Sequence, residues 1–296
     1  LKSIKKIQFS IITAKPNYPG GRIFTKYRKR GILTENYYSH KIYHLPVFPR
    51  RSGTSFFLLL NYFSFLFSSI FYGTRYLKRK KIDFVFVYNT SPITQILVGY
   101  YFKVFFGVKL ASWVQDIWPE SVSATNHARE NLLFKIFRQI CHYIYRLNDV
   151  LILQSIYFEK YFRKYKIYLK NIYIPNTANI SKKITKNNFI LKKKFKYNFV
   201  YAGNIGMAQE FENFEIFLKK LYEQKKDVKF HLIGSGSYKK ILTERIKENK
   251  IKNVEIYPYI NNKNLYYYLM QADVCFLSLK DNYIFNFTIP SKLQNY

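Results

Sequence analysis

The feature that most constrains the fold is an alternation of short apolar runs with longer segments of helical periodicity. Runs rich in β-branched and aromatic residues predict strands at residues 8–13, 84–88, 109–114, 150–153, 172–174, 199–202, 229–233, 254–257 and 274–277. Among the segments between them, residues 131–147 carry one apolar stripe at a spacing near 3.6, formed by Leu132, Leu133, Ile136, Phe137, Ile140 and Ile144. This alternation predicts an α/β protein with parallel sheets.

A polar seam divides the predicted strands into two sets. Pro175 and several asparagines lead into a Lys-rich stretch, which ends where the second strand set begins. A chain of 296 residues has room for two domains of ordinary size. We therefore predict an N-terminal domain over residues 1–175, a linker over 176–196 and a C-terminal domain over 197–296, as two Rossmann-like lobes facing a cleft.

The charge of the chain points to a polyanionic partner. Lys and Arg total 49 against 17 Asp and Glu, which gives a net charge of +32. Nucleic acid, anionic lipid and phosphorylated substrates all fit this charge, and compositional drift of an AT-rich genome explains it equally well. Lys and Tyr are spread through every segment and no nucleic-acid-binding signature is present. A basic nucleic-acid-binding protein remains an alternative, although we expect no nucleic acid partner.

An uncharged run at Ser52–Thr74 has the length of a membrane span, about 20 residues. A basic segment follows, with Arg75, Lys78, Arg79, Lys80 and Lys81. Three interpretations stand: an interfacial helix that dips into one leaflet, a buried helix of the first lobe, or a span that makes this an integral membrane protein. The basic cluster and the strand that follows favour an interfacial helix on an anionic membrane surface.

Glycine turns follow two strands of the second set. In "VYAGNIGMAQ" a strand leads to Gly203–Gly206 and then to a helix, and "LIGSGS" repeats the design at Gly234 and Gly236. Such turns let a backbone approach a phosphate, and a helix N-terminus offers free N–H groups to it. Ordinary turn chemistry explains the same glycines. The spacing is not the dinucleotide fingerprint, because no third glycine follows.

A third element of the second set is "TIPSKLQNY", in which Pro290 and Ser291 predict a helix start. Lys292 then lies in the first turn, beside a positive dipole end, where a lysine suggests a nearby anion. Because ligands of open α/β sheets collect at the carboxyl ends of the strands, the three elements predict one diphosphate-binding crevice.

Two carboxylates and both tryptophans of the chain lie together in "KLASWVQDIWPES". The strand 109–114 places Gln115 and Asp116 at its carboxyl end. Asp116 is either the carboxylate that orients or deprotonates an acceptor hydroxyl, or an Asp that caps the next helix. Glu120 fits the first turn of that helix better than a catalytic role.

Nothing in the sequence predicts a metal or a disulfide. Cys141 and Cys275 are far apart, and the five histidines lack metal-ligand spacing. No Asp-x-Asp pair is present to hold a divalent cation on a nucleotide diphosphate. We therefore expect no cofactor and no metal, with backbone N–H groups and cationic side chains stabilising a leaving diphosphate.

Several of these motifs occur together in a known family. "PNYPGGRIF", "SWVQDIWPES", "YAGNIGMAQ", "LIGSGS", "QADVCFLSL" and "IPSKLQNY" resemble, in order and context, bacterial retaining glycosyltransferases of family 4, in the O-antigen and capsule subgroup that includes L-fucosamine-type transferases. The resemblance implies a GT-B fold with an acceptor-binding N-lobe and a nucleotide-sugar-binding C-lobe. It also implies metal-independent transfer with retention to a lipid-linked saccharide, by a cytoplasmic enzyme peripheral to the inner face of the cytoplasmic membrane.

The resemblance also implies roles for single residues. Asp116 is the expected catalytic residue. Substrate-binding residues are expected at Gly203, Asn204, Gly206, Gln209, Gly234, Gly236, Tyr259, Ser291, Lys292, Gln115 and Glu120. Met207 stands where the family usually has an arginine.

Two parts of the family pattern are not found in the chain: a first strand with its Gly-rich loop, and two glutamates beyond the Pro-Ser-Lys helix. We accordingly expect a fragment that is inactive by itself. Another GT-B enzyme, such as a nucleotide-sugar epimerase, is the remaining alternative.

Overall fold

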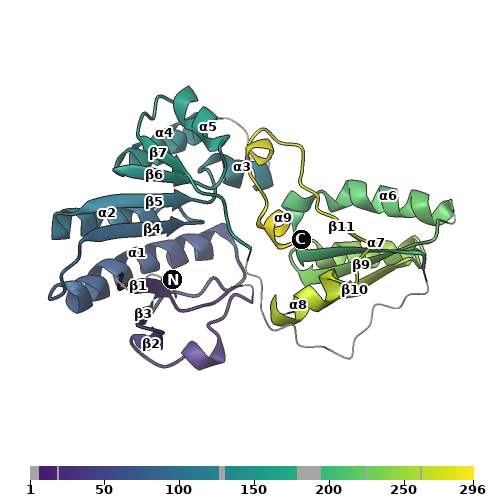
Figure 1. Cartoon of the computed structure of the whole chain (residues 1–296), viewed down its shortest axis with the longest axis horizontal. Helices are drawn as coiled ribbons and strands as arrows, with labels where there is room; N and C mark the ends of the chain where they lie inside the picture. Colours follow the sequence, from purple (N-terminus) through teal and green to yellow (C-terminus); the bar gives the residue numbers. More distant parts are fainter. Residues whose placement is uncertain (1–6, 19, 127–130, 179–194, 225, 261) are drawn as a thin grey trace. The chain divides into compact units, whose positions relative to one another are not determined.

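The computed structural model describes residues 7–18, 20–126, 131–178, 195–224, 226–260 and 262–296, and the chain divides into two compact units (Figure 1). The first unit holds β1–β7 with α1, α2, α4 and most of α5. The second holds β8–β11 with α6–α9, and α3 groups with it. Residues 179–194 of the predicted linker lie outside the described residues.

A small sheet opens the first unit. Strand β1 (Ser10–Ala14) pairs in parallel with β3 (His40–Leu45), and β2 (Leu33–Tyr37) pairs antiparallel with β3. The predicted strand at 8–13 is confirmed, whereas the β2–β3 hairpin was not predicted. A two-residue turn joins the pair, with Tyr38 in a left-handed conformation at φ 54°.

A four-stranded parallel sheet carries the candidate residues of the first unit. Its order is β4 (Phe84–Asn89), β5 (Lys109–Val114), β6 (Val150–Leu153) and β7 (Lys170–Tyr173). The strands are joined through α2 (Gln95–Phe106), α4 (Leu132–Arg146) and α5 (Phe158–Lys164), with α3 (Glu120–Asn126) between β5 and α4. Since all four strands run in parallel, the residues that follow them lie along one edge of the sheet.

Helix α1 (Ser55–Leu77) turns its polar side chains inward and its phenylalanines outward. Asn61 and Ser69 are buried, and the side-chain amide of Asn61 donates to the Phe48 carbonyl at 2.6 Å. The outward stripe is between 49% and 66% exposed and consists of Phe56, Leu59, Phe63, Phe67 and Phe71. The interpretation of this segment as a buried core helix is therefore wrong. By length and composition the helix could cross a membrane, and only 17% of its most apolar window is buried.

Helix α4 reverses the pattern that its sequence suggests. A regular apolar stripe normally faces the core. In α4 five of its six members are exposed, namely Leu132, Leu133, Ile136, Phe137 and Ile140, and only Ile144 is buried. The core contacts come instead from Cys141, His142 and Tyr145, next to Ile144. The hydroxyl of Tyr145 fixes the chain beyond β5, which explains why this face of the helix is turned inward.

The second unit is a parallel sheet of order β10-β9-β8-β11 (Figure 1). Its strands are β8 (Tyr197–Asn204), β9 (Val228–Ser235), β10 (Val254–Tyr257) and β11 (Val274–Cys275). Helices α6 (Phe211–Glu223) and α7 (Lys239–Glu248) cover one face, where the core includes Tyr201, Phe230 and Leu232. Helix α8 (Asn262–Leu269) packs on the other face, and the short α9 (Ser291–Asn295) ends the chain. The α/β class with parallel sheets is thus confirmed in both units.

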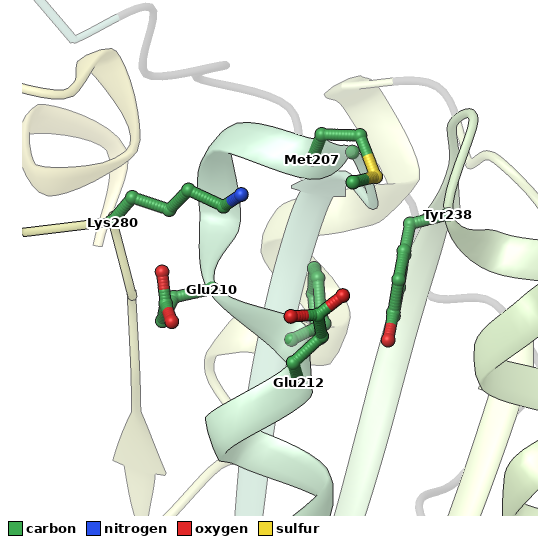
Figure 2. A pocket seen from close by; sticks show the side chains of 7 residues that line it. Met207, Glu210, Glu212, Tyr238 and Lys280 are labelled. Atoms are coloured by element: carbon green, nitrogen blue, oxygen red, sulfur yellow. The ribbon is translucent and has the colours of Figure 1, made fainter. Parts of the chain in front are cut away.

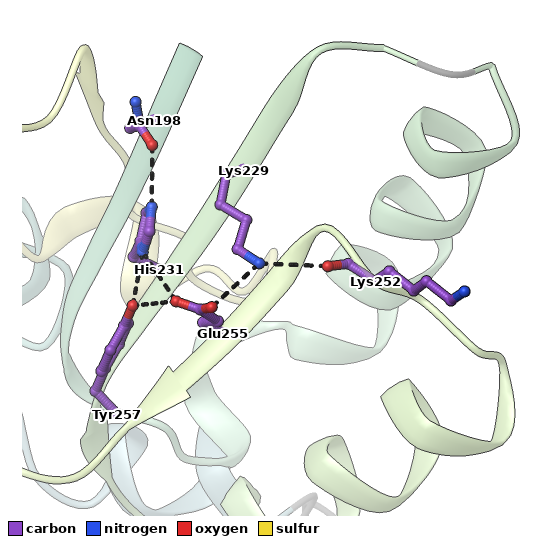
Figure 3. Close-up of polar contacts among 6 residues, drawn as sticks. All are labelled: Asn198, Lys229, His231, Lys252, Glu255 and Tyr257. Atoms are coloured by element: carbon purple, nitrogen blue, oxygen red, sulfur yellow. Dashed lines mark hydrogen bonds and ion pairs between the residues drawn. The ribbon is translucent and has the colours of Figure 1, made fainter. Parts of the chain in front are cut away.

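A buried polar chain ties three strands of the second sheet together (Figure 3). His231 of β9 is completely buried between the Asn198 side-chain oxygen, 3.2 Å from its Nε2, and the Tyr257 hydroxyl, 3.1 Å from its Nδ1. Tyr257 in turn donates to Glu255, and the Lys229 ammonium lies 3.4 Å from the same carboxylate. Burial lowers the pKa of His231 to about 4, so the imidazole is neutral at pH 7.

We predict that His231 makes the second unit sensitive to acid. Its pKa is near 6.5 when unfolded and about 4 when folded, so the unfolded state binds more protons between these values. The free energy of unfolding should therefore fall as the pH drops from about 6.5 to 4. Urea titrations across this window should show a shallower fall for His231→Gln than for the natural chain, and identical slopes would contradict the assignment.

Candidate functional site

The carboxyl edge of the second sheet is closed by two facing glycines. Gly203 is the last residue but one of β8 and lies opposite Gly234 of β9, and their φ angles are 146° and 158°. A Cβ atom on Gly234 would lie 1.8 Å from the Gly203 carbonyl oxygen. Close approach of the two strands thus explains glycine at 234 without any ligand. Gly234 lies within β9 and not in a turn, so strand packing is the constraint that the structure shows at this position.

Lys292 lies directly over Gly203. Helix α9 begins at Ser291 after Pro290, as predicted. A Cβ atom on Gly203 would lie 2.2 Å from Cε of Lys292, so glycine leaves the space that the lysine stem occupies. The Lys292 ammonium donates to the Tyr201 hydroxyl at 2.5 Å and lies 4.5 Å from the centre of that ring. Nothing in the sequence singles out Tyr201, which looks like a core residue of an apolar strand.

Burial lowers the pKa of Lys292 to about 8. No ion pair of Lys292 is found among the described residues. A partly desolvated ammonium with a neutral phenol as its partner is stabilised by an incoming anion. The position of Lys292 at the carboxyl edge of a parallel sheet makes it the strongest candidate in the chain for binding a phosphate group.

Tyr296 anchors the helix that carries Lys292. Its hydroxyl donates to the Ala202 carbonyl at 3.1 Å and accepts from the Ala202 N–H at 2.8 Å. The side chain therefore bonds to β8 next to Gly203, and it holds α9 against the strand. Sequence reasoning missed this contact, because a tyrosine four residues after a lysine carries no distinctive signal.

The turn at Gly203–Gly206 differs from the prediction. The Gly206 N–H donates to the Gln209 side-chain oxygen at 3.0 Å. Asn204 donates its side-chain amide to the same oxygen at 3.4 Å. A 3-10 turn over Met207–Gln209 and Glu210, with φ 52°, separate the glycine turn from α6. A strand and a helix flank the turn as predicted, but the 3-10 turn lies between the turn and α6, and Gln209 caps the turn.

A shallow hollow lies beside this turn (Figure 2). It is lined by Gly206, Met207, Glu210, Phe211, Glu212, Tyr238 and Lys280. Figure 2 shows the carboxylates of Glu210 and Glu212 near the turn, with Lys280 on the same side as Glu210. Two carboxylates repel a phosphate, and Met207 adds no charge where the resemblance implies an arginine. The candidate for such a charge is Lys292, which lies over Gly203.

The remaining predicted residues of the second unit lie around the same edge. Gly236 faces the carbonyl oxygen of Ile205, Ser291 is exposed at the start of α9, and Tyr259 is exposed in the loop after β10. No contact of Tyr259 or Ser291 with Lys292 is found in the described part of the chain. Two groups of predicted residues thus lie together in the structure. Lys292 lies over Gly203, which faces Gly234. Gln209 forms hydrogen bonds with Asn204 and Gly206.

In the first unit, Asp116 follows β5 at the carboxyl edge of the four-stranded sheet. The Gln115 N–H donates to the Asn89 carbonyl at 2.9 Å, which joins the ends of β4 and β5. Burial raises the pKa of Asp116, and its charge adds to the burial that raises the pKa of Tyr88. The carboxylate therefore lies near a phenol in a partly desolvated place, as a general base requires.

The interpretation of Asp116 as a helix cap does not fit. Helix α3 begins at Glu120, so the residue before its first turn is Pro119 and Asp116 is too early to cap it. Glu120 is the first-turn acid that was expected. The backbone is held by Tyr145, whose hydroxyl donates to the Asp116 carbonyl at 3.3 Å and accepts from the Trp118 N–H at 2.9 Å.

Trp118 has a structural role. Its indole N–H donates to the Ser91 hydroxyl at 2.8 Å, and its ring is buried between Tyr62 of α1 and Phe137 of α4. The other tryptophan, Trp113, packs edge-on against Tyr88 with 5.5 Å between the ring centres. The two indoles support the loop after β5, and Asp116 stays the candidate of this loop for a chemical role.

Comparison with solved structures identifies the fold class. Sucrose-phosphate synthase from Thermosynechococcus elongatus superposes on 90% of this chain with a TM-score of 0.63 at 16% identity, and this chain spans 63% of its length. A variant of TarM from S. aureus, solved with fondaparinux, α-GlcNAc-glycerol and UDP, covers 72% of this chain with a TM-score of 0.52 at 12% identity, and 40% of its own length is matched.

These structures are glycosyltransferases of the GT-B class, and at such identities they establish the fold of two Rossmann-like units. The chain spans between 40% and 63% of their lengths. No protein-family model matches the sequence, and no curated protein matches it closely enough to be called similar.

Proposed function

We propose that the protein is a glycosyltransferase that moves a sugar from a nucleotide-diphosphate donor to a lipid-linked saccharide. The observation that carries the proposal is the partly buried Lys292 ammonium over Gly203, at the carboxyl edge of a GT-B-class sheet and with a phenol as its partner. TarM, which shares this fold, was solved with UDP. A nucleotide-binding second unit also fits the excess of positive charge on the chain.

In the proposed reaction the bond between the sugar anomeric carbon and the diphosphate oxygen breaks, and the acceptor oxygen bonds to the same face of that carbon. The leaving diphosphate gains negative charge, which Lys292 stabilises in a poorly solvated place. Asp116 orients the acceptor hydroxyl or takes its proton, for which its raised pKa is suited. We propose that the reaction retains the anomeric configuration and needs no metal, with these side chains in place of a cation.

We further propose that the protein is peripheral to the inner face of the bacterial cytoplasmic membrane and serves cell-surface polysaccharide synthesis. The outward phenylalanines of α1 support this proposal, since five large apolar side chains in one exposed stripe are unusual for a helix in water. The stripe leads toward the basic residues 75–81, which suit an anionic leaflet. A lipid-linked acceptor would be presented at that surface.

We expect Phe63→Ser/Phe67→Ser to weaken binding to vesicles of phosphatidylglycerol and phosphatidylethanolamine by about tenfold or more, because two inserted aromatic rings are lost. Co-sedimentation measures the partition coefficient. Phe84→Ser/Phe86→Ser is the control, since these β4 side chains are about as exposed but lie away from α1. Equal losses in both variants would indicate nonspecific adsorption. Carbonate should release the natural protein from membranes, and retention would indicate a span.

The transferase proposal is tested with membranes from cells that produce the whole protein. Donors carrying radioactive sugars on UDP, GDP, dTDP and CDP are supplied in EDTA, and label is followed into the lipid fraction. Transfer that depends on Lys292 and leaves the anomeric configuration unchanged supports the proposal. Release of a modified nucleotide sugar with no labelled lipid would support an epimerase instead.

A further inference from the structure

A second exposed apolar surface lies on α4, which the function proposed above does not use. Its stripe runs over the whole helix and is formed by Leu132, Leu133, Ile136, Ile140 and Tyr143, each at least 50% exposed. The opposite face of α4 is buried in the core through Cys141, Ile144 and Tyr145. The stripe is therefore held rigidly outward by the packing of the opposite face.

The α4 stripe continues a wider apolar layer. Helix α2 contacts both α1 and α4, so the three helices are neighbours in the first unit (Figure 1). Between the two outer helices, α2 contributes Tyr100, Val104 and Phe105, all exposed. Trp118 joins α1 to α4 through ring contacts with Tyr62 and Phe137. The first unit thus presents apolar side chains from three adjacent helices.

The charges of these helices indicate what covers the layer. Helices α1, α2 and α4 contain no Asp or Glu. In α4 the exposed Lys135 and Arg146 flank the apolar stripe on one side. A second copy of the chain would bring the same positive flanks and a net charge of +32 against this surface, which opposes association. A bilayer with anionic headgroups is complementary to both the apolar stripe and its basic flank.

We propose that α4 is a second membrane-contacting helix, which inserts Leu132, Leu133, Ile136, Ile140 and Tyr143 among anionic phospholipids. The proposal extends the membrane contact proposed for α1, and it makes the first unit bind through a surface of several helices. Lys135 and Arg146 lie at the headgroup level, where each cation near an anionic surface strengthens binding. Two contacts with one bilayer hold the unit in a fixed orientation, which a single interfacial helix does not.

The test compares two matched double variants by co-sedimentation with phosphatidylglycerol and phosphatidylethanolamine vesicles. Ile136→Ser/Ile140→Ser removes two α4 side chains that are each about half exposed. The control, Ile216→Ser/Ile241→Ser, makes the same exchange at exposed positions of α6 and α7. We expect the α4 variant to bind at least about tenfold more weakly and the control to bind like the natural chain. Both should bind poorly to neutral phosphatidylcholine vesicles.

A fluorophore on Ile140→Cys supplies a second readout that does not depend on the loss of binding. Its emission should shift to the blue on anionic vesicles, whereas a fluorophore on Ile216→Cys should not respond, and labelled natural protein corrects for Cys141 and Cys275. An unchanged partition coefficient or an absent shift overturns the proposal. So does a dimer in sedimentation that Ile136→Ser/Ile140→Ser dissociates without effect on vesicles, which would make the stripe a protein interface. Since vesicle binding needs neither donor nor acceptor, a failure of the transferase proposal would leave this result intact.

Discussion

Replacing Lys292 with methionine should reduce transfer by about 100-fold or more, because a single group that stabilises developing charge at a desolvated site contributes on that scale. Methionine fills a similar space over Gly203 and cannot pair with a diphosphate. The same substitution should leave the protein as stable as before or more stable. Burial lowers the pKa of Lys292 to about 8, so at pH 7 the folded chain holds an ammonium that is better solvated when unfolded.

The lowered pKa of Lys292 should make both the free energy of unfolding and the donor affinity depend on pH. Between about pH 8 and 10.5 the unfolded chain binds more protons at this lysine, so the contribution of Lys292 to the free energy of unfolding rises with pH across that window. Donor affinity should change in the opposite sense and weaken above pH 8, as the ammonium loses its charge. In Lys292→Arg, whose charge persists, that weakening should disappear.

Lys240→Met is the matched control, since Lys240 is exposed on α7. Calorimetric titration with nucleotide diphosphates and thermal unfolding measure the two effects separately. Loss of affinity together with lost stability would mean that Lys292 acts only in packing. Full affinity in Lys292→Met would remove it from the site.

In the whole protein, replacing Asp116 with asparagine should lower kcat for transfer by between about 100-fold and 10,000-fold, with little change in donor affinity. Asparagine keeps the size of the side chain and cannot take a proton. Glu120→Gln is the control, because Glu120 begins α3 as an ordinary first-turn acid. We expect at most a severalfold effect from it. Equal losses in the two variants, measured as initial rates with saturating donor, would contradict the assignment of Asp116.

The raised pKa of Asp116 should also be visible in the pH dependence of the transfer rate. A base must be ionised to act, so the rate should rise as pH increases through the pKa of Asp116 and fall again above pH 8 as Lys292 loses its proton. The rising limb should be missing in the residual activity of Asp116→Asn. A rising limb that survives the substitution would assign the base to another residue.

Much of the fold could be predicted because buried parallel strands are short, apolar and bounded by polar turns. The runs at 109–114, 150–153 and 254–257 coincide with strands of the structure. The hairpin β2–β3 was not predicted, because Glu35, Asn36 and Lys41 interrupt its apolar pattern with polar residues on the exposed side. A local pattern identifies strands most reliably when both faces of the sheet are covered.

The helices show the limit of periodicity. A stripe at a spacing near 3.6 indicates that one face of a helix differs from the other, but it does not say which face the protein buries. In α1 the core takes Asn61, whose side-chain amide donates to the Phe48 carbonyl, and the small side chain of Ser69. In α4 the core takes Tyr145, which the loop around Asp116 requires. In both helices the most apolar residues remain outside.

The sequence predicted where the candidate residues lie in the fold but only some of their contacts. Asp116 and Gly203 were placed by the carboxyl ends of strands, and Lys292 by the helix start at Pro290 and Ser291. Gln209 could not be expected to take the Gly206 N–H, because that contact depends on a 3-10 turn that the sequence does not signal. Tyr201 and Tyr296 were missed because their hydroxyls matter only once α9 is folded back onto β8.

The central claim is that Lys292 and the glycine edge of the second unit bind a nucleotide diphosphate without a metal. The most direct measurement is calorimetric titration of the purified protein with UDP, GDP, dTDP and CDP in EDTA, repeated with Lys292→Met. We expect at least one of the four to bind in EDTA and Lys292→Met to weaken its binding by tenfold or more. If none of the four binds, or if the nucleotide binds Lys292→Met as tightly as the natural chain, Lys292 and the glycine edge are not a metal-independent diphosphate site.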